Sequence, residues 1–302
     1  MNAGATDPAT RQGVYFALAA YSFWGIVPVY FKWVDHVSPW EILGHRIVWA
    51  VVLLIAILAW IGRLAELCIP VRRLPQLILT AGLLSINWLV FIYAIVNDNI
   101  AGTSLGYFIN PLVSVLLGVV FLKESLRPLQ WVAITIAAAG IMIQLLIFGE
   151  IPWVGLTLAF SFGFYGLVRK NLALHPIGGL AIETLIVLPF AIGYLAWSYQ
   201  NNSLTFGDSL RIDLLLMLGG FVTSFPLLCF AAAVSRLSLT AIGMFQYVAP
   251  SLTLLLAIFV YGEPFDTARA LTFSCIWAAL AIFSIEAWHH HRKMQARGLT
   301  RI

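Results

Sequence analysis

The chain has 302 residues, of which 61% are hydrophobic and only 10% are charged, and its formal net charge is +4. A soluble domain carries roughly 25% charged residues, so this composition excludes a soluble domain as the main body of the protein. The basic residues lie between apolar runs rather than in one patch, which excludes a nucleic-acid-binding surface.

Long apolar runs follow one another along the whole chain. Each is near the ~20 residues that a membrane-spanning helix needs, and lipid offers an irregular backbone no hydrogen-bond partners. We therefore predict an all-α membrane protein with ten transmembrane helices, at residues 14–33, 42–61, 77–96, 100–122, 131–148, 153–168, 177–199, 214–234, 239–261 and 271–288. The first run is too long for the apolar core of a signal peptide, so we expect the first span to stay uncleaved.

The basic residues of the loops predict the orientation of these spans. With the N-terminus in the cytoplasm, thirteen Lys and Arg residues fall in cytoplasmic segments, and only Lys32, Arg211 and Arg269 fall on the opposite side. Positive charge is retained on the cytoplasmic side of a membrane. We therefore expect both termini in the cytoplasm, as an N-terminal tail at residues 1–13 and a basic C-terminal tail at residues 289–302.

Residues 107–125 and 246–264 share one plan. Thirteen positions separate Pro111 from Glu124 in the first segment, and thirteen separate Pro250 from Glu263 in the second. The predicted orientation makes these spans antiparallel, so we predict two five-helix inverted repeats, at residues 14–148 and 149–288. Such repeats are typical of secondary transporters, because exchanging the conformations of the two halves opens the protein to the other side. The alternative is a duplication that serves only packing.

Several short stretches are more specific than this repeat: Asn87-Trp88, residues 106–111 (GYFINP), residues 183–185 (ETL) and residues 246–250 (QYVAP). Together with the spans, they make the chain resemble the drug/metabolite transporter superfamily, EamA type, and most closely its RarD permeases. The resemblance implies a permease of the bacterial inner membrane with a central cavity between the halves. We expect alternating access around that cavity for a small organic solute or drug, either amino-acid-like or amphipathic.

Ionisable residues inside the spans are the first candidates for the solute pathway. Arg46, with His45 beside it, lies in the second span, and Glu183 lies in the equivalent seventh span. A charge in the membrane interior is costly and tends to face a cavity or a partner. Arg46 could hold an anionic group such as a carboxylate, and Glu183 could hold an amine or a proton, which would couple transport to protons. The alternative is an ion pair between helices, or snorkelling, that serves only assembly.

Polar residues share one face of each helix in the repeated pair. Tyr107, Asn110, Ser114 and Gly118 follow helical spacing on the fourth span, and Gly243, Gln246, Thr253 and Ala257 do so on the ninth. Small residues on such a face allow helices to pack closely, and this explains Ser114, Gly118, Thr253 and Ala257. Asn110 and Gln246 are larger and carry donors and acceptors that packing does not need, so we assign them, together with Tyr107, to the pathway. Pro111 and Pro250 each remove a helix hydrogen bond, which predicts either a gating hinge or a static kink.

Aromatic and amide side chains complete the predicted pathway. They are Asn87, Trp88 and Tyr93 on the third span, with Trp24 and Tyr165 at matching places in the first span of each half. Aromatic rings can bind amphipathic or cationic solutes by stacking and cation–π contact. Other tryptophans are expected in the interfacial belt.

A second functional class stays open, an intramembrane enzyme or lipid-modifying protein that uses His45, Arg46 and Glu183. The repeat favours transport, because an enzyme needs no oppositely oriented halves. The three cysteines lack metal-ligand spacing and no nucleotide or nucleophile motif occurs, so we expect no metal, no cofactor and no catalytic residue. The expected partners are the lipid bilayer and the solute. One chain supplies both halves, so a monomer is sufficient, and a dimer remains an alternative.

Overall fold

A computed structural model describes residues 8–96, 100–148, 153–260 and 267–296, and this part of the chain contains helices and no strand. The α-helices are α1 Pro8–Ile26, α2 Pro28–Trp33, α3 Pro39–Trp60, α4 Leu74–Val96, α5 Ile100–Phe121, α6 Pro128–Phe148, α7 Trp153–Leu172, α8 Pro176–Gln200, α9 Leu210–Val234, α10 Leu239–Gln246, α11 Val248–Phe259 and α12 Thr267–Ala296. Two short 3-10 helices, η1 Leu64–Leu67 and η2 Val71–Arg73, precede α4.

Within the described residues, eight helices are long and apolar enough to cross a membrane. The predicted spans at 100–122 and 153–168 are not among them. The first is represented by the shorter apolar stretch Gly106–Phe121, and the second by α7, whose last turn carries Arg169 and Lys170. The all-helical membrane architecture is confirmed, and the count of ten spans in two inverted repeats stays a prediction.

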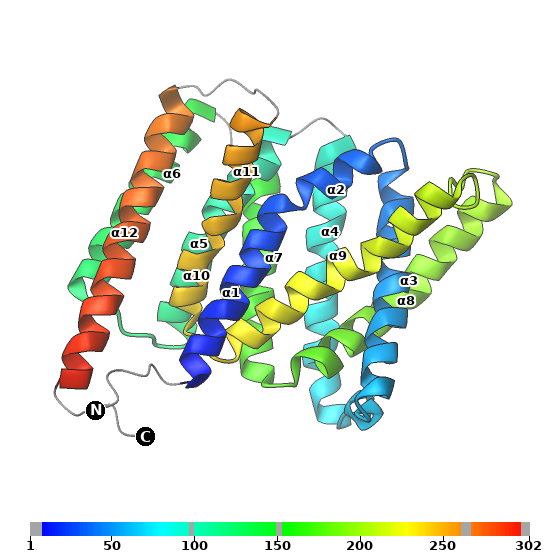
Figure 1. Cartoon of the computed structure of the whole chain (residues 1–302), viewed down its shortest axis with the longest axis horizontal. Helices are drawn as coiled ribbons and strands as arrows, with labels where there is room; N and C mark the ends of the chain where they lie inside the picture. The colour runs from blue at the N-terminus through cyan, green and yellow to red at the C-terminus, as the bar shows by residue number, and fades with distance from the viewer. Residues whose placement is uncertain (1–7, 97–99, 149–152, 261–266, 297–302) are drawn as a thin grey trace.

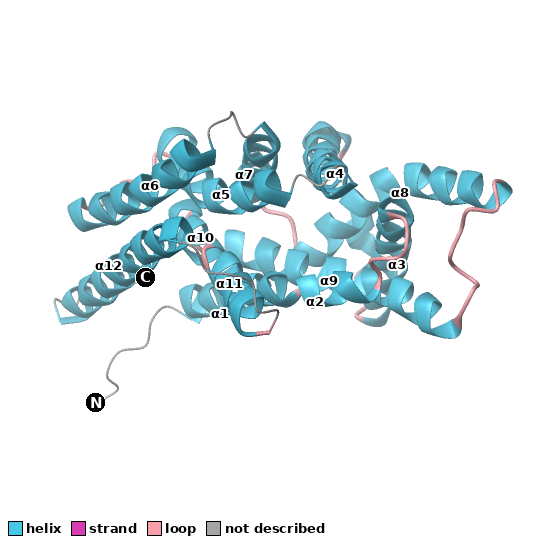
Figure 2. Ribbon diagram, turned by 90° about the horizontal axis from the view of Figure 1, so that it is seen from above, coloured by secondary structure: helices cyan, strands magenta, loops and turns pink. Residues whose placement is uncertain are grey.

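The helices form two layers that lie face to face (Figure 2). One layer contains α6, α5, α7 and α4, and the other contains α12, α10, α11, α1 and α9. At one end α6 packs on α12, and at the other end α3 packs on both α8 and α9 (Figure 1). The start of α1 and the end of α12 lie at the same side of the molecule.

The surface and the interior of the bundle are both apolar. Phe190 and Phe259 are 78% and 79% exposed, and an exterior of this kind is suited to lipid contact. Inside, Tyr165 and Phe230 are fully buried and anchor a cluster that joins α1, α7 and α9. The layers are therefore held together by packing between aromatic and aliphatic side chains.

Two of the predicted spans are interrupted within the bundle. The helix is interrupted at Val27, between α1 and α2, and at Tyr247, between α10 and α11. Pro28 begins α2 and Pro250 lies in the first turn of α11, and a proline cannot donate the backbone hydrogen bond that would continue the preceding helix. By contrast, α5 continues through Pro111 without a break. The hinge role predicted for the two prolines stays untested.

Candidate functional site

Arg46 is held at a junction of four helices. From α3, its Nε donates a 2.8 Å hydrogen bond to Thr223 Oγ1 on α9. The central carbon of its guanidinium group lies 5.5 Å from the ring centre of Phe31 on α2 and 5.7 Å from that of Trp88 on α4. These ring faces stabilise the cation, while the hydroxyl of Thr223 fixes its direction. Phe31 and Thr223 were not predicted, since neither residue type stands out in an apolar run.

Two phenol groups are the electrostatic neighbours of this guanidinium. They belong to Tyr30 on α2 and Tyr107 on α5. Tyr30 donates a 3.0 Å hydrogen bond to the carbonyl of Leu215, whereas the Tyr107 side chain is 49% exposed. Among the described residues, no carboxylate forms an ion pair with Arg46. The structure therefore places a cation that has no countercharge among the described residues near a half-exposed phenol.

Farther along α5, its polar face is covered by α10. Gln246 Nε2 donates a 3.0 Å hydrogen bond to Ser114 Oγ, and both side chains are buried. A Cβ on Gly243 would lie 2.7 Å from the carbonyl oxygen of Pro111, so the two backbones touch at this point. Asn110 lies between this contact and Tyr107 on α5, and its Oδ1 is buried with no hydrogen-bond partner among the described residues. We call the α5–α10 contact the seam.

At the end of the seam, Glu124 connects the segment after α5 to the start of α10. Its carboxylate accepts hydrogen bonds of 2.6 and 2.9 Å from the backbone N–H groups of Leu239 and Thr240, which begin α10. An acidic group at a helix N-terminus satisfies free N–H donors and interacts favourably with the helix dipole. Glu124, three residues beyond the end of α5, therefore caps a helix from the other half of the sequence.

Glu183 does not face the same space as Arg46. Its Oε1 lies 3.4 Å from Arg169 Nη1, and its Oε2 accepts a 3.2 Å hydrogen bond from the hydroxyl of Tyr165. Glu183 is 1% exposed and Arg169 is 4% exposed. Arg169 was missed as a site residue because it was counted among the loop cations. Arg169 lies four residues after Tyr165 and therefore on the same face of the helix, and this spacing could have indicated that both side chains reach the same partner.

The remaining predicted pathway residues lie in separate surroundings. Trp24 packs against Tyr21, Phe162 and Phe230 in the core, with ring centres 5.4 to 6.1 Å apart. Asn87 Nδ2 bridges α4 to α7 by 3.0 Å hydrogen bonds to Ser161 Oγ and the Leu158 carbonyl. Tyr93 is 48% exposed and lies 5.5 Å from Trp153. The structure thus brings together Arg46, Trp88 and Tyr107, with Asn110 and Gln246 farther along the seam face.

The residues of the enzymatic alternative are not gathered in one place. His45 lies 3.9 Å from Glu41 and stacks on Phe206, with the ring centres 4.6 Å apart. Glu41 in turn accepts backbone hydrogen bonds from Thr205 and Phe206 in the α8–α9 loop. His45 thus shares neither the contacts of Arg46 nor those of Glu183. In the described ranges, no three His, Cys, Asp or Glu side chains are grouped to hold a metal ion.

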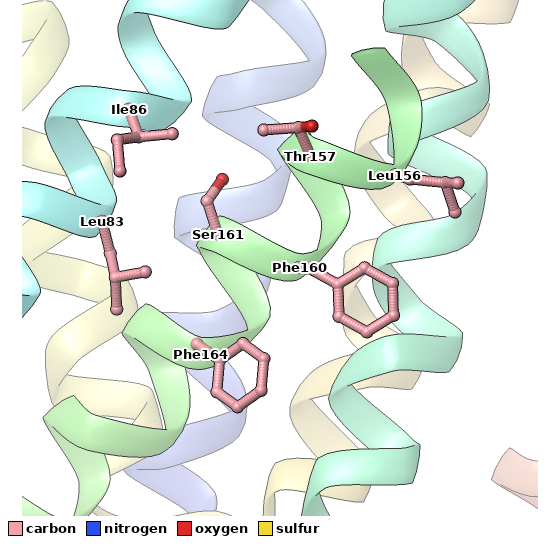
Figure 3. A pocket seen from close by; sticks show the side chains of 7 residues that line it. All are labelled: Leu83, Ile86, Leu156, Thr157, Phe160, Ser161 and Phe164. Atoms are coloured by element: carbon pink, nitrogen blue, oxygen red, sulfur yellow. The ribbon is translucent and has the colours of Figure 1, made fainter. Parts of the chain in front are cut away.

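A separate hollow of about 350 Å³ lies between α4 and α7 (Figure 3). Its lining is mainly apolar and consists of Leu83, Ile86, Leu156, Thr157, Phe160, Ser161 and Phe164. None of the residues that contact Arg46 takes part in it. Ile86 and Phe160 are 48% and 40% exposed, so the hollow belongs to the apolar exterior and not to the charged site.

Comparisons with known proteins agree with this architecture. Residues 11–146 and, separately, residues 151–285 match the EamA-like transporter family. The chain is 47% identical to an uncharacterized transporter of Vibrio cholerae, over 91% of this chain and 93% of the relative. It is 44% identical to protein RarD of Escherichia coli, over 94% and 97% of the two chains. It is also 30% identical to the chloramphenicol-sensitive protein RarD of Pseudomonas aeruginosa, over 95% and 98%.

One solved crystal structure superposes with a TM-score of 0.73 and covers 92% of this chain and 98% of its own. At 17% sequence identity, it supports the fold alone.

Proposed function

Since the chain belongs to the EamA-like transporter family and is a multi-pass protein of the bacterial inner membrane, we propose that it carries a small organic solute by alternating access. In this proposal α1 with α2, and α10 with α11, each form one span, which gives ten spans with both termini cytoplasmic. The two separate family matches, at 11–146 and 151–285, support a division into two halves. Names that include "transporter" among the relatives point away from an enzyme.

One observation carries the mechanism: the polar face of α5 is accessible at one end and closed at the other. Tyr107 is 49% exposed beside Arg46, while Ser114 is 1% exposed at the seam. The α10 side of the seam lies toward the start of α1 and the end of α12 (Figure 1). With cytoplasmic termini, this is a state that is closed to the cytoplasm and open to the opposite side.

Opening to the cytoplasm requires the seam to part. The Ser114–Gln246 hydrogen bonds and the cap that Glu124 places on α10 would have to be released together. Pro111 on α5 and the interruption at Tyr247, next to Pro250, are the positions at which the two helices can bend. The two halves would then exchange conformations around Arg46, Trp88, Tyr107 and Asn110, as an inverted repeat permits.

Glu183 is the group that we propose for proton coupling. It is sealed from the solute in this state, so protonation would act through its partners: loss of its charge would release Arg169, which also donates a 3.0 Å hydrogen bond to the carbonyl of Pro176. Coupling would thus change how α7 packs on the start of α8. No direct contact between Glu183 and the solute is needed.

Reconstitution of the purified chain into liposomes tests this function. Labelled amino acids and amphipathic drugs would be screened for uptake, with and without a pH gradient. We expect at least one compound to accumulate, and proton-driven accumulation to be lost in Glu183→Gln and in the charge-free double variant Glu183→Gln/Arg169→Gln. Equilibration without pH dependence would contradict coupling through Glu183. Absence of any flux through folded protein would contradict the transport function.

A further inference from the structure

The guanidinium group of Arg46 has hydrogen-bonding capacity that the described protein does not use. Its Nε is bound to Thr223 Oγ1, and no described residue accepts a hydrogen bond from its two terminal nitrogens. These nitrogens form a planar fork that matches an oxyanion with two parallel hydrogen bonds. A partly buried cation with unused donors is an incomplete site that an anion would complete.

The side chains around this fork favour a particular kind of organic group on the anion, in addition to its negative charge. The rings of Phe31 and Trp88 lie against the guanidinium, and Tyr107, which interacts electrostatically with the guanidinium, is half-exposed. Such surfaces favour a flat apolar group, because stacking and burial of apolar area both stabilise it there. The site therefore suits an amphipathic anion better than a small inorganic one.

The carboxylates of Glu183 and Glu41 are already bound within the protein. Asp213, in the first turn of α9, lies ten residues before Thr223 and accepts a 2.7 Å hydrogen bond from the Gly207 N–H. Glu183 is buried against Arg169 and Tyr165. Glu41, on the same helix as Arg46, accepts two hydrogen bonds from the Thr205 N–H and one from that of Phe206. An α-ammonium group beside Arg46 would lose its hydration without gaining a countercharge, which is unfavourable.

We propose that Arg46, with Trp88, Phe31 and Tyr107, binds amphipathic organic anions, and that ligands of net negative charge are preferred over zwitterions and cations of the same shape. The identification of such an anion as the carried solute rests on the transport function proposed above. The binding preference itself does not, so the two can fail separately.

A matched set of phenyl compounds tests the preference directly. Binding of 3-phenylpropionate, phenylalanine and phenyltrimethylammonium to the full-length chain in detergent would be measured by calorimetry and by tryptophan fluorescence. We expect 3-phenylpropionate to bind at least tenfold more tightly than the other two. Equal affinity for all three, or a preference for the zwitterion or the cation, would overturn the proposal.

Variants locate the binding to Arg46. Arg46→Gln should weaken 3-phenylpropionate binding at least tenfold, and Arg46→Lys, which keeps the charge but lacks the fork, should weaken it less. Arg72→Gln, at an exposed arginine of η2, is the matched control and should leave the affinity unchanged. Gel filtration and thermal unfolding establish that each variant is folded. Unchanged affinity in folded Arg46→Gln would overturn the assignment.

Counterflow in liposomes separates the two proposals. Anion binding that depends on Arg46, without any flux, would contradict the transport function and leave the binding site intact. Flux of the cation or the zwitterion without anion binding would contradict the binding site and leave transport intact.

Discussion

Arg46 and Arg169 are two arginines within one apolar bundle, and their side chains have opposite surroundings. Arg169 lies 3.4 Å from the Glu183 carboxylate, and both side chains are almost inaccessible. Arg46 contacts a hydroxyl and aromatic rings, with no carboxylate among its described neighbours. A buried ion pair costs desolvation energy and is kept together by its own attraction, whereas an unpaired cation at an accessible position is available to a ligand.

The Glu183–Arg169 pair predicts a stability effect that depends on which charge is removed. Glu183→Gln leaves Arg169 buried without a countercharge, which should cost about 3–5 kcal/mol of unfolding free energy. The double variant Glu183→Gln/Arg169→Gln removes both charges and should recover part of this loss. Thermal unfolding in detergent measures the effect, with Arg72→Gln as the exposed control. A single variant as stable as the parent chain would contradict the pair's structural role.

At the scale of helices, the seam is the element that divides the polar face of α5 into an accessible and a closed part. It depends on small residues, since Gly243 allows the α10 backbone to touch α5 at Pro111. It also depends on a cap that crosses between the halves, because Glu124 follows α5 and accepts hydrogen bonds from the first residues of α10. Closure is thus a matter of backbone contact and not of one large side chain.

Gly243→Ala tests the seam with a single added methyl group. The new Cβ would lie 2.7 Å from the Pro111 carbonyl oxygen, so the closed state should lose about 1–3 kcal/mol, or roughly 5- to 150-fold in its population. The matched control is Gly82→Ala on α4, where an added Cβ meets nothing within 4 Å. The readout is the rate at which an added Ser114→Cys thiol reacts with a labelling reagent. Equal protection of that thiol with Gly243→Ala and with the control would contradict the seam.

At the scale of the whole molecule, the start of α1 and the end of α12 lie at one side of the bundle, and the beginning of α5 lies at the other (Figure 1). The layers meet at the seam between α5 and α10, and where α6 packs on α12. In the proposed topology of ten spans with cytoplasmic termini, this arrangement corresponds to a state open to the periplasm. A transporter in this state needs one rearrangement, the parting of the seam, to release its solute on the other side.

The sequence predicted the features that depend on local composition. Apolar runs indicated the helices, and the continuous helix α5 agrees with the helical spacing of Tyr107, Asn110 and Ser114. The partners of Glu183 and Arg46 could not be predicted from the sequence, because they depend on which α7 side chains reach Glu183 and on how α9 packs on α3. The interruption at Tyr247 was foreseen only as a bend at Pro250, since the exact end of a helix depends on its tertiary contacts.

The central claim, access from one side at a time, is tested most directly by thiol labelling. Tyr107→Cys and Ser114→Cys would be made separately in a chain whose Cys68, Cys229 and Cys275 are replaced by serine, and labelled with an impermeant reagent in right-side-out and inside-out vesicles. We predict that the thiol at 107 reacts faster from the periplasmic side than from the cytoplasmic side, because the seam is closed in this state. The thiol at 114 should be protected from the periplasmic side and should react from the cytoplasmic side only when the seam opens. Simultaneous reaction of both thiols from both sides would indicate a continuous pore and would contradict alternating access.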